Sequence, residues 1–559
     1  MEAWFFILIF SLSICVLLKS LFNFLQYKNP KETRKLPPGP PTLPIIGNLL
    51  WLRKSLSDLE LIIRHLSQKY GPVVTLYIGS NPTIFVTSYE LAQQALIQNG
   101  AIFASRPPVL EATGIITSKH DINSTPYGSL WRLLRRNLTS EILHSSRVKS
   151  YSHARKSVME ILINKLRPQA GSGNAVRVMD HFQYAMFCLL VFMCFGDTLD
   201  EKTVREIEAV QRVLLVNFFR FNLLNFFPKI LFRKRWRQLL EVRRNQEEVL
   251  IPLIRARQEL KKVVNQEKSI TSYVDTLLDL EELPDEGRKL SEMEMVSLCS
   301  EFLTAGTDTT STVLQWIMAR LVKHKDIQAK LFSEINGVVD VGSGEEIKEE
   351  DLQRMPYLKA VVLEGLRLHP PGHFTVPHAV TEDTSLDGYV VPKTATVHFL
   401  VGEMGWDPKV WEDPMEFRPE RFLSGRDGGE VLDVTGRRET KMMPFGAGRR
   451  ICPGLGLAML LLEYFVANLV REFEWTAADG HDVDLSEKQE FTVVMKNPLR
   501  AHISPSSETS GIVLDFRGPT QMKCNLDYSR HASGAGRLDE ALELIDNIVV
   551  KKQVLGCFA

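Results

Sequence analysis

Apolar residues are spaced in three ways along the chain, and each spacing predicts a different element. Nearly all of the 22 residues from Trp4 to Leu25 are apolar, enough for a helix that crosses a bilayer. Residues 73–87, VVTLYIGSNPTIFVT, predict two β-branched strands around a turn. Apolar residues recur every three or four positions in Ser291–Lys323 and Asp351–Leu368, which predicts helices. Most of the chain has this period, so we expect a mainly α fold with a small β portion.

The residues around the first apolar run predict how it is used. A cleaved secretory signal would have basic residues before the run and a small-residue cleavage site after it, whereas Glu2 precedes this run. Basic residues follow it instead, at Lys28, Lys31, Arg34 and Lys35. By the positive-inside rule, residues 1–27 are a retained transmembrane anchor, and the rest of the chain is cytosolic.

Proline marks the next boundaries. Residues 28–48 combine the basic stop with LPPGPPTLPIIGN at 36–48, which predicts a stiff, extended arm between the membrane and a folded domain. A strand pattern at 387–400 is broken at Pro392. Because no long linker divides the middle of the chain, we expect one large domain at 49–505.

The segment Asn217–Trp236 carries seven aromatic residues and several arginines. It is typical of an amphipathic helix pair packed on the core. It is equally typical of an apolar, basic-rimmed surface that touches lipid and admits lipophilic molecules.

Charge and cysteine content narrow the function classes. Lys+Arg and Asp+Glu are both 67, so no global charge favours nucleic acid. The seven cysteines are scattered and odd in number, which is typical of a reducing compartment. Cys188 and Cys194 lie in an apolar run and are expected to be buried as small hydrophobic residues.

One cysteine has unusual neighbours. Cys452 lies in PFGAGRRICPG at 444–454, just before the apolar run 455–470, which predicts a buried helix. The helix N-terminus, Arg449 and Arg450 are expected to lower the thiol pKa toward thiolate. Three glycines permit close backbone packing or positive φ: Gly446, Gly448 and Gly454. A thiolate on such a loop suits an axial iron ligand, although a lone cysteine before a helix can also be structural.

This string resembles the haem-ligand signature of the cytochrome P450 family, which it matches at Phe445, Gly448, Arg450, Cys452 and Gly454. The resemblance extends from residue 36 to about residue 505, and its layout is similar to microsomal, plant-type members. It implies the P450 fold, haem b with Cys452 as axial thiolate, and the other four residues around the cofactor.

A second motif, AGTDTT at 305–310, interrupts an apolar helix with Gly306 and several hydroxyls, which are poor helix formers. A local bend would explain it. The resemblance instead implies a catalytic pair, in which Thr309 contacts bound dioxygen and Asp308 relays protons.

Glu364 and Arg367 lie three residues apart in LEGLRLHP, so they share one helix face and can pair. The resemblance adds Arg421 of PERF to form a buried, structural ion network below the haem loop.

In PYGSLWRLLRR, Trp131 and Arg135 lie four apart on one helix face. The resemblance implies that both bind a haem propionate, together with His378 and Arg450. The neighbouring Arg132 and Arg136 form a solvated basic face or dock an acidic redox partner.

The family's variable regions correspond here to 106–122, 211–232, 301–305, 372–376 and 491–494. The resemblance implies that an apolar substrate pocket is lined by Glu301, Ala305, Phe374, Val376 and Phe491.

Residues 506–559 extend beyond the expected domain. Their segment 528–548 resembles one hairpin of a pentatricopeptide repeat, but a single unit cannot bury its own apolar face. We expect a disordered or loosely docked extension or a fusion remnant.

The main hypothesis is therefore a monooxygenase of secondary metabolism, anchored by a single span in the endoplasmic reticulum membrane. It would oxidise a lipophilic small molecule with electrons from NADPH, delivered by NADPH–cytochrome P450 reductase, with cytochrome b5 as a further partner and no nucleic acid. Two alternatives stay open: a haem-thiolate isomerase or dehydratase that consumes peroxides without a reductase, and a non-catalytic RNA-binding or scaffold protein defined by the tail.

Overall fold

The computed structural model describes most of the chain between Lys35 and Ser506. The described residues are 10, 11, 14, 35–43, 47–48, 56–196, 199–226, 229–263, 270–284, 286–339, 347–423, 434–478 and 482–506. Most of the predicted anchor, most of the basic stop and residues 507–559 lie outside these ranges, so the expectations for them remain predictions.

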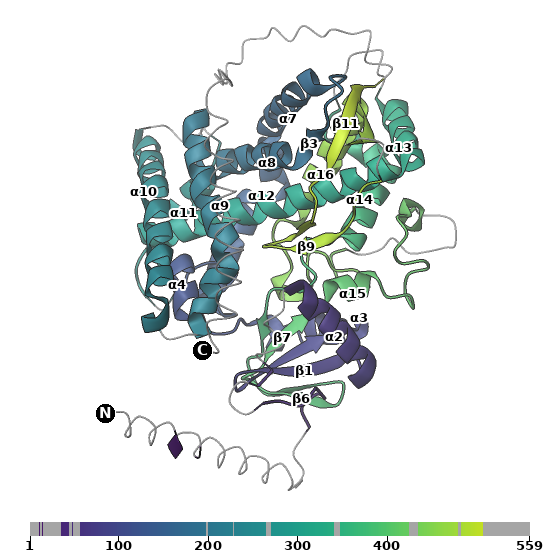
Figure 1. Cartoon of the computed structure of the whole chain (residues 1–559). Coiled ribbons are helices and arrows are strands. Elements are labelled where there is room, and N and C mark those ends of the chain that lie inside the picture. Colours follow the sequence, from purple (N-terminus) through teal and green to yellow (C-terminus); the bar gives the residue numbers. More distant parts are fainter. Residues whose placement is uncertain are drawn as a thin grey trace.

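Helices make up most of the described fold, as the sequence pattern predicts (Figure 1). The α-helices are α2 (Leu56–Tyr70), α3 (Tyr89–Gln93), α4 (Glu111–Thr117), α5 (Ser129–Asn137), α6 (Ser145–Ser150), α7 (Ser152–Leu166), α8 (Val178–Phe195), α9 (Glu201–Leu223), α10 (Arg233–Val263), α11 (Tyr273–Leu278), α12 (Glu292–Lys323), α13 (Lys325–Val338), α14 (Pro356–Leu368), α15 (Val401–Gly405) and α16 (Leu455–Glu472). Short π and 3₁₀ turns are η2 (Gln94–Gln98), η3 (Ile102–Ala104), η4 (Leu138–Ile142), η5 (Arg167–Gln169), η6 (Leu224–Phe226), η7 (Lys229–Phe232), η10 (Asp351–Arg354), η11 (Pro419–Phe422) and η12 (Gly448–Arg450).

The strands form four small sheets. Their bounds are β1 (Val73–Ile78), β2 (Asn81–Val86), β3 (Val176–Arg177), β4 (His378–Ala379), β5 (Thr384–Leu386), β6 (Tyr389–Val391), β7 (Thr396–Phe399), β8 (Phe473–Ala477), β9 (Glu487–Gln489), β10 (Val493–Met495) and β11 (Arg500–Pro505). One sheet has the order β1-β2-β7-β4 and another β3-β11-β8, while β5–β6 and β9–β10 are pairs. The predicted hairpin is confirmed, with Val73 opposite Val86. The break at Pro392 is also confirmed, because it separates β6 from β7.

Helix α12 passes through the middle of the helical region and is buried along most of its length (Figure 1). Its first turn is closed by a capping box in which Ser291 and Glu294 each accept the other's backbone N–H. The helix predicted for Ser291–Lys323 is therefore confirmed. The single helical segment predicted for Asp351–Leu368 is wrong in detail: it divides into η10 and α14, since Pro356 disfavours helical backbone in the residue before it.

The described part of the proline-rich arm is docked on the sheet at the other end of the molecule. The carbonyl of Pro38 accepts from the backbone N–H of Thr75 at 2.9 Å, and Asn48 Oδ1 accepts from that of Tyr77 at 2.8 Å. Gly39 is required here, because a Cβ atom would lie 2.0 Å from the carbonyl oxygen of Thr75. The arm is thus an added edge of the sheet over these residues.

Asn217–Trp236 forms the end of α9, two 3₁₀ turns and the start of α10, and these helices pack against each other. Phe221, Leu224 and Trp236 are buried in one small cluster, whereas Ile230 and Leu231 are 66% and 70% exposed. The helix pair is confirmed, and its turn presents apolar side chains outward.

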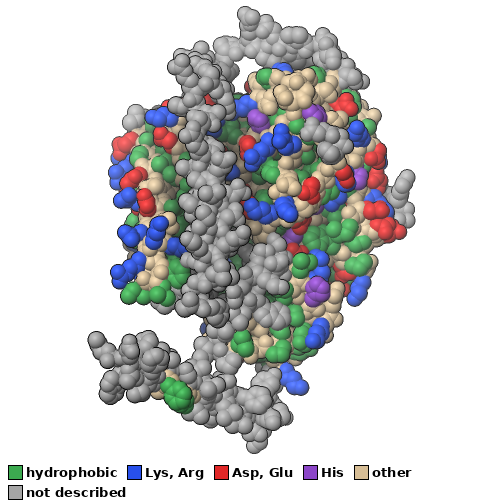
Figure 2. Space-filling view, viewed as in Figure 1, with side chains coloured by type: hydrophobic (Ala, Val, Ile, Leu, Met, Phe, Trp, Pro, Cys, Tyr) green, Lys and Arg blue, Asp and Glu red, His purple; other side chains and the backbone are tan. Residues whose placement is uncertain are grey.

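Two further expectations concern apolar helices and charge. Among the described residues, α8 is long and apolar enough to cross a membrane, but 78% of it is buried inside the fold, so it is a core helix. Cys194 on α8 is fully buried and Cys188 partly so, and neither forms a disulfide bond with another described residue. On the face shown in Figure 2, basic and acidic side chains are both present across the described surface.

Candidate functional site

Cys452 lies on a tight loop directly before α16. Its backbone N–H donates to the carbonyl of Phe445 at 2.8 Å, which closes the loop, and Gly454 is the N-cap of α16. The position predicted for Cys452 is confirmed. An open concavity of about 780 Å³ borders this loop; it is lined by Leu96–Ile102, Thr435, Arg437, Gly448, Arg449, Ile451, Cys452 and Leu455.

Two of the three glycines have the predicted reason to be glycine. Gly446 and Gly448 take φ values of 69° and 70°, in the left-handed region. At Gly448 a Cβ atom would also lie 2.1 Å from the carbonyl oxygen of Leu96. The expectation is wrong for Gly454, whose φ is −83° and whose Cβ would make an ordinary 3.8 Å contact with Cys452 Sγ.

The expected lowering of the Cys452 pKa is also wrong for the protein alone. Burial raises the thiol pKa and outweighs a hydrogen bond from the backbone of Gly454 and the charge of Arg135. Arg449 and Arg450 were expected to act on the thiol. Instead, Arg449 donates to the hydroxyl of Tyr127, and Arg450 is committed to backbone carbonyls. A bound metal would deprotonate the thiol outright.

Four predicted cofactor contacts gather beside this loop. Arg135 donates to the carbonyl of Ile451 at 2.6 Å, and the Arg450 guanidinium lies 4.4 Å from the centre of the Trp131 ring. The indole N–H of Trp131 is buried and has no hydrogen-bond partner within the described protein.

His378 is buried and donates from Nδ1 to the carbonyl of Phe103 at 2.7 Å. Burial and the charge of Arg106 lower the pKa of His378 to about 3, so its imidazole is neutral.

Arg106 belongs to the same set and was not predicted. It is buried, and it donates to the carbonyls of Asn123, Val376 and Pro377. Burial and the charge of Arg450 lower its pKa to about 9. Its sequence signal is an arginine set between the apolar turn IFA and two prolines.

The AGTDTT motif lies within a continuous helix. A Cβ atom at Gly306 would lie 2.6 Å from Leu190 of α8, so this glycine permits close packing of α8 on α12. Thr309 Oγ1 donates to the carbonyl of Ala305 at 2.6 Å. Ala305 is exposed, and Thr304, Gly306, Thr307 and Thr309 are partly exposed, whereas most of α12 is buried, which indicates an open space beside the centre of α12.

Asp308 is 7% exposed and accepts two side-chain hydrogen bonds. Thr492 Oγ1 donates to Oδ2 at 2.8 Å, and Gln183 Nε2 donates to Oδ1 at 3.4 Å. Burial raises the Asp308 pKa, and the bond from Thr492 opposes it. Neither Thr492 nor Gln183 was predicted, because no local motif relates them to Asp308.

The structure brings Glu364, Arg367 and Arg421 together. Arg367 makes two hydrogen bonds to Glu364, at 2.7 and 2.8 Å, and Arg421 donates to the same carboxylate at 3.1 Å. Glu364 and Arg367 side chains are fully buried.

The predicted pocket residues lie in different surroundings. Glu301 accepts from the backbone N–H groups of Ile122 and Asn123 at 2.9 and 2.7 Å, so it anchors the loop before α5. Burial and the charge of Asp121 raise the Glu301 pKa to about 8. Ala305 is described above, and Val376 is 43% exposed.

The two predicted pocket aromatics also differ from each other. The Phe374 ring packs edge-on against Phe85 at a centroid distance of 6.0 Å, in a small core beside the sheet. The Phe491 ring lies 5.6 Å from that of Phe218 on α9, at right angles. Phe491 thus joins the segment after β9 to α9, whereas Phe374 contributes to the core.

These groups fit a flat cofactor that carries carboxylates. The thiol of Cys452 would supply one ligand, and arginine and indole donors suit ionised propionates. The buried, unpartnered N–H of Trp131 fits such an acceptor, since buried donors are normally satisfied.

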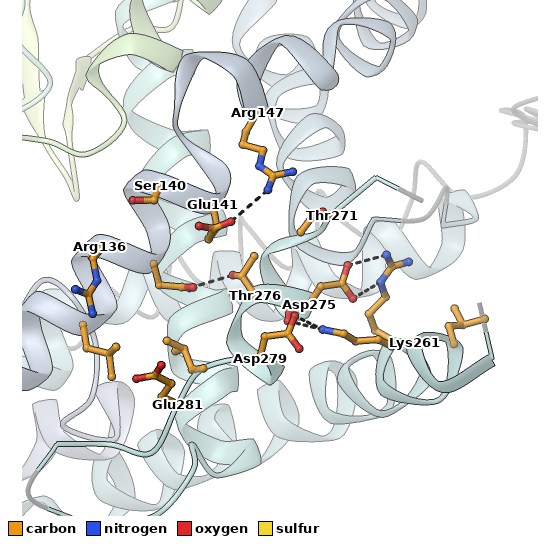
Figure 3. Close-up of a pocket in the computed structure, with 15 residues that line it drawn as sticks. Arg136, Ser140, Glu141, Arg147, Lys261, Thr271, Asp275, Thr276, Asp279 and Glu281 are labelled. Atoms are coloured by element: carbon orange, nitrogen blue, oxygen red, sulfur yellow. Dashed lines mark hydrogen bonds and ion pairs between the residues drawn. The ribbon is translucent and has the colours of Figure 1, made fainter. Parts of the chain in front are cut away.

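A separate cleft of about 660 Å³ lies between α5, α10 and α11 (Figure 3). Its charged side chains pair with one another: Arg257 with Asp275 at 2.7 Å, and Arg147 with Glu141 at 3.4 Å. Its lining includes Arg136 of the predicted basic face, but none of the residues predicted for the cofactor, the catalytic pair or the substrate pocket.

Comparison with known proteins agrees with this geometry. A family profile described as Cytochrome P450 matches residues 37–504. The chain is 50% identical over 515 residues to cytochrome P450 89A9 of Arabidopsis thaliana, covering 89% of this chain and 98% of that protein. It is 33% identical over 512 residues to geraniol 8-hydroxylase of Catharanthus roseus, covering 88% and 98%. Its fold is similar to that of a zebrafish cytochrome P450 solved with progesterone, with a TM-score of 0.68 and 24% identity, covering 80% of this chain and 99% of that one.

Proposed function

The chain belongs to the cytochrome P450 family and is a haem-thiolate monooxygenase, and on this premise we propose that Cys452 is its axial ligand and that its substrate is a lipophilic small molecule. The observation that carries the proposal is the position of Cys452 on a closed loop, beside a buried indole N–H and two arginines. When bound, haem with a thiolate ligand supplies dioxygen activation.

The other residues of the site are proposed to bind the cofactor and to supply a proton. Trp131, Arg135 and the remaining guanidinium N–H groups of Arg450 would hold the carboxylates of the cofactor and fix its orientation. Asp308 is the proton donor on the substrate side, because it is buried next to Thr309 and burial raises its pKa. Thr309 and Thr492 are the hydroxyls that place this proton, and Thr492 already contacts the Asp308 carboxylate.

The substrate is proposed to be lipophilic because Phe218 contacts Phe491, the residue before the Asp308 partner Thr492, and because Val376 is exposed. Two relatives support oxidation of small organic molecules, since their names are geraniol 8-hydroxylase and geranylhydroquinone 3''-hydroxylase.

We further propose attachment to the endoplasmic reticulum membrane through residues 1–27, with electrons from NADPH through NADPH–cytochrome P450 reductase and with cytochrome b5 as a further partner. The exposed apolar turn at Ile230 and Leu231 supports a second contact with lipid. Arg132 and Arg136 are exposed on α5 and support docking of an acidic redox protein.

The test is expression of the full chain, of a chain ending at residue 505, and of Cys452→Ser. The reduced carbon monoxide difference spectrum should show a thiolate-type band in both proteins that retain Cys452 and none in the serine variant. Lipophilic compounds are then screened for a spin-state shift. A thiolate-type band in Cys452→Ser would overturn the ligand assignment. Loss of the band on removal of 506–559 would instead favour a function defined by the tail.

A further inference from the structure

A buried imidazole lies between two carboxylates at the junction of three elements. His373 follows α14, is 5% exposed, and contacts Glu60 of α2 through Nδ1. Its Nε2 atom is 3.3 Å from Oε2 of Glu487, the first residue of β9, which is ion-pair distance without hydrogen-bond geometry. Burial lowers the His373 pKa, but the hydrogen bond and charge of Glu60 and the charge of Glu487 outweigh this and raise it overall.

A second imidazole fixes the proton arrangement. Arg320 Nε donates to His369 Nε2 at 3.0 Å, and since an arginine can only donate, this nitrogen must accept. His369 is therefore neutral with its proton on Nδ1, which donates to Glu487 Oε1 at 3.1 Å. Burial lowers its pKa to about 4, in agreement. Glu487 thus receives a neutral donor on one oxygen and faces His373 with the other.

The charged groups nearest to His373 are balanced when it is protonated. Arg64 of α2 donates to Glu403 of α15 at 2.5 Å and to Glu60 at 3.2 Å. With His373 charged, three cations face three carboxylates, namely Arg64, Arg320 and His373 against Glu60, Glu403 and Glu487. A neutral His373 would leave one buried negative charge unbalanced, which is unfavourable at low dielectric.

Glu487 leads directly into the turn above the proposed pocket. Residues 490–492 join β9 to β10, and Phe491 in this turn contacts Phe218 of α9. The next residue, Thr492, donates to Asp308. The position of β9 therefore sets both an aromatic wall of the pocket and a hydrogen-bond partner of the proposed proton donor.

We propose that His373, as an imidazolium ion bridging Glu60 and Glu487, is a positioning residue that holds the β9–β10 turn over the substrate pocket. Recognition of a bulky lipophilic ligand then depends on the charge of His373, which acts on the pocket through Glu487 and the turn. The proposal rests on the proposed function for the identity of the pocket, although the contact between β9 and His373 does not.

The first test compares two azoles that bind haem iron and shift its absorbance. Imidazole reports access to the iron alone, whereas clotrimazole also fills the pocket. His373→Gln should weaken clotrimazole about tenfold and leave imidazole within about twofold. His373→Gln/Glu487→Gln restores the charge balance and should recover most of the affinity for clotrimazole.

Lys488→Gln is the matched control, because Lys488 lies on the same strand but is 58% exposed. It should change the affinity for neither imidazole nor clotrimazole. Equal clotrimazole binding by wild type and His373→Gln, or a double variant no better than the single one, would overturn the proposal.

The second test needs no variant, haem or substrate. Because the His373 pKa is raised on folding, its contribution to stability is complete at low pH and is lost as pH rises through the folded value. Hydrogen exchange of residues 487–495, corrected for intrinsic rates, should lose about tenfold protection between about pH 6.5 and about pH 9. The β1–β2 hairpin is the internal control. Unchanged protection of 487–495 refutes the role of His373, whereas failure to bind haem refutes only the proposed function.

Discussion

Arg367 is joined to Glu364, one helical turn earlier on α14, by two hydrogen bonds of 2.7 and 2.8 Å, and neither side chain has any exposed surface. Glu364 also accepts from Arg421 and from the backbone N–H of Arg418. One carboxylate is therefore shared by two guanidinium groups. The Glu364 carboxylate thus connects α14 to the segment that precedes the cysteine loop in the chain.

Glu364→Gln should lower the free energy of unfolding by about 3–5 kcal/mol, because it leaves a buried guanidinium without a counter-charge. Urea denaturation measures this loss, and haem content should fall with it. Glu412→Gln removes a carboxylate that is 83% exposed, and should change stability by less than about 1 kcal/mol. If the two variants were equally stable, the network would not support the fold.

Gly448→Ala should destabilise the cysteine loop, because the new methyl group would overlap the carbonyl of Leu96 and the residue has positive φ. We expect a loss of about 2 kcal/mol or more in unfolding free energy and reduced haem retention. Gly337→Ala in α13 has no atom within 4 Å and should be neutral or stabilising by up to about 1 kcal/mol. Normal haem retention by Gly448→Ala would contradict the steric argument.

Asp308→Asn should separate stability from activity. A carboxyl group whose pKa is raised on folding stabilises the folded state below its unfolded pKa, and this advantage is lost as pH rises through the folded value. The variant should therefore gain stability relative to wild type as pH rises, while substrate oxidation falls about tenfold or more. Denaturation at several pH values and product formation measure the two effects. If the unfolding free energies of the two proteins changed with pH in parallel, the Asp308 pKa would not be raised by folding.

Glu463 on α16 provides a pH-dependent test away from the proposed pocket. Burial raises its pKa to about 7, against the opposing charge of Lys359. Its ionisation should therefore destabilise the fold as pH rises from about 4.5 to 7, and Glu463→Gln should be more stable than wild type at pH 8 by about 2 kcal/mol. Glu160→Gln, an exposed carboxylate on α7, is the control and should show no such gain. A gain of the same size at pH 4 would contradict the assignment.

Local patterns were sufficient to predict the elements. The hairpin at 73–87, the helix from Ser291 to Lys323 and the break at Pro392 all depend on periodicity or on proline within a few residues. The proline-rich arm shows the limit of this reasoning. Its composition predicts extended backbone, but its docking on β1 depends on strand atoms that are distant in sequence.

The sequence predicted the motif residues of the candidate site, but it did not predict the residues that contact them from distant parts of the chain. Cys452 and Asp308 stand in recognisable strings, whereas Thr492 and Arg106 reach the site only through folding. The wrong expectation for the Cys452 pKa has the same origin. Sequence places Arg449 and Arg450 beside the thiol, but the fold directs both guanidinium groups elsewhere and buries the sulfur.

The hydrogen bonds of Arg450 connect the loop of Cys452 to a segment that α12 also holds. It lies two residues before Cys452, and it donates to the carbonyls of Ala104, Ile122 and Thr125. Glu301 of α12 holds the backbone N–H of Ile122 from the opposite direction. The loop that carries Cys452 and the central helix α12 are thus both hydrogen-bonded to the same short segment of the chain. Movement of Arg450 or of Glu301 would therefore displace the same segment, which couples the loop of Cys452 to the middle of α12.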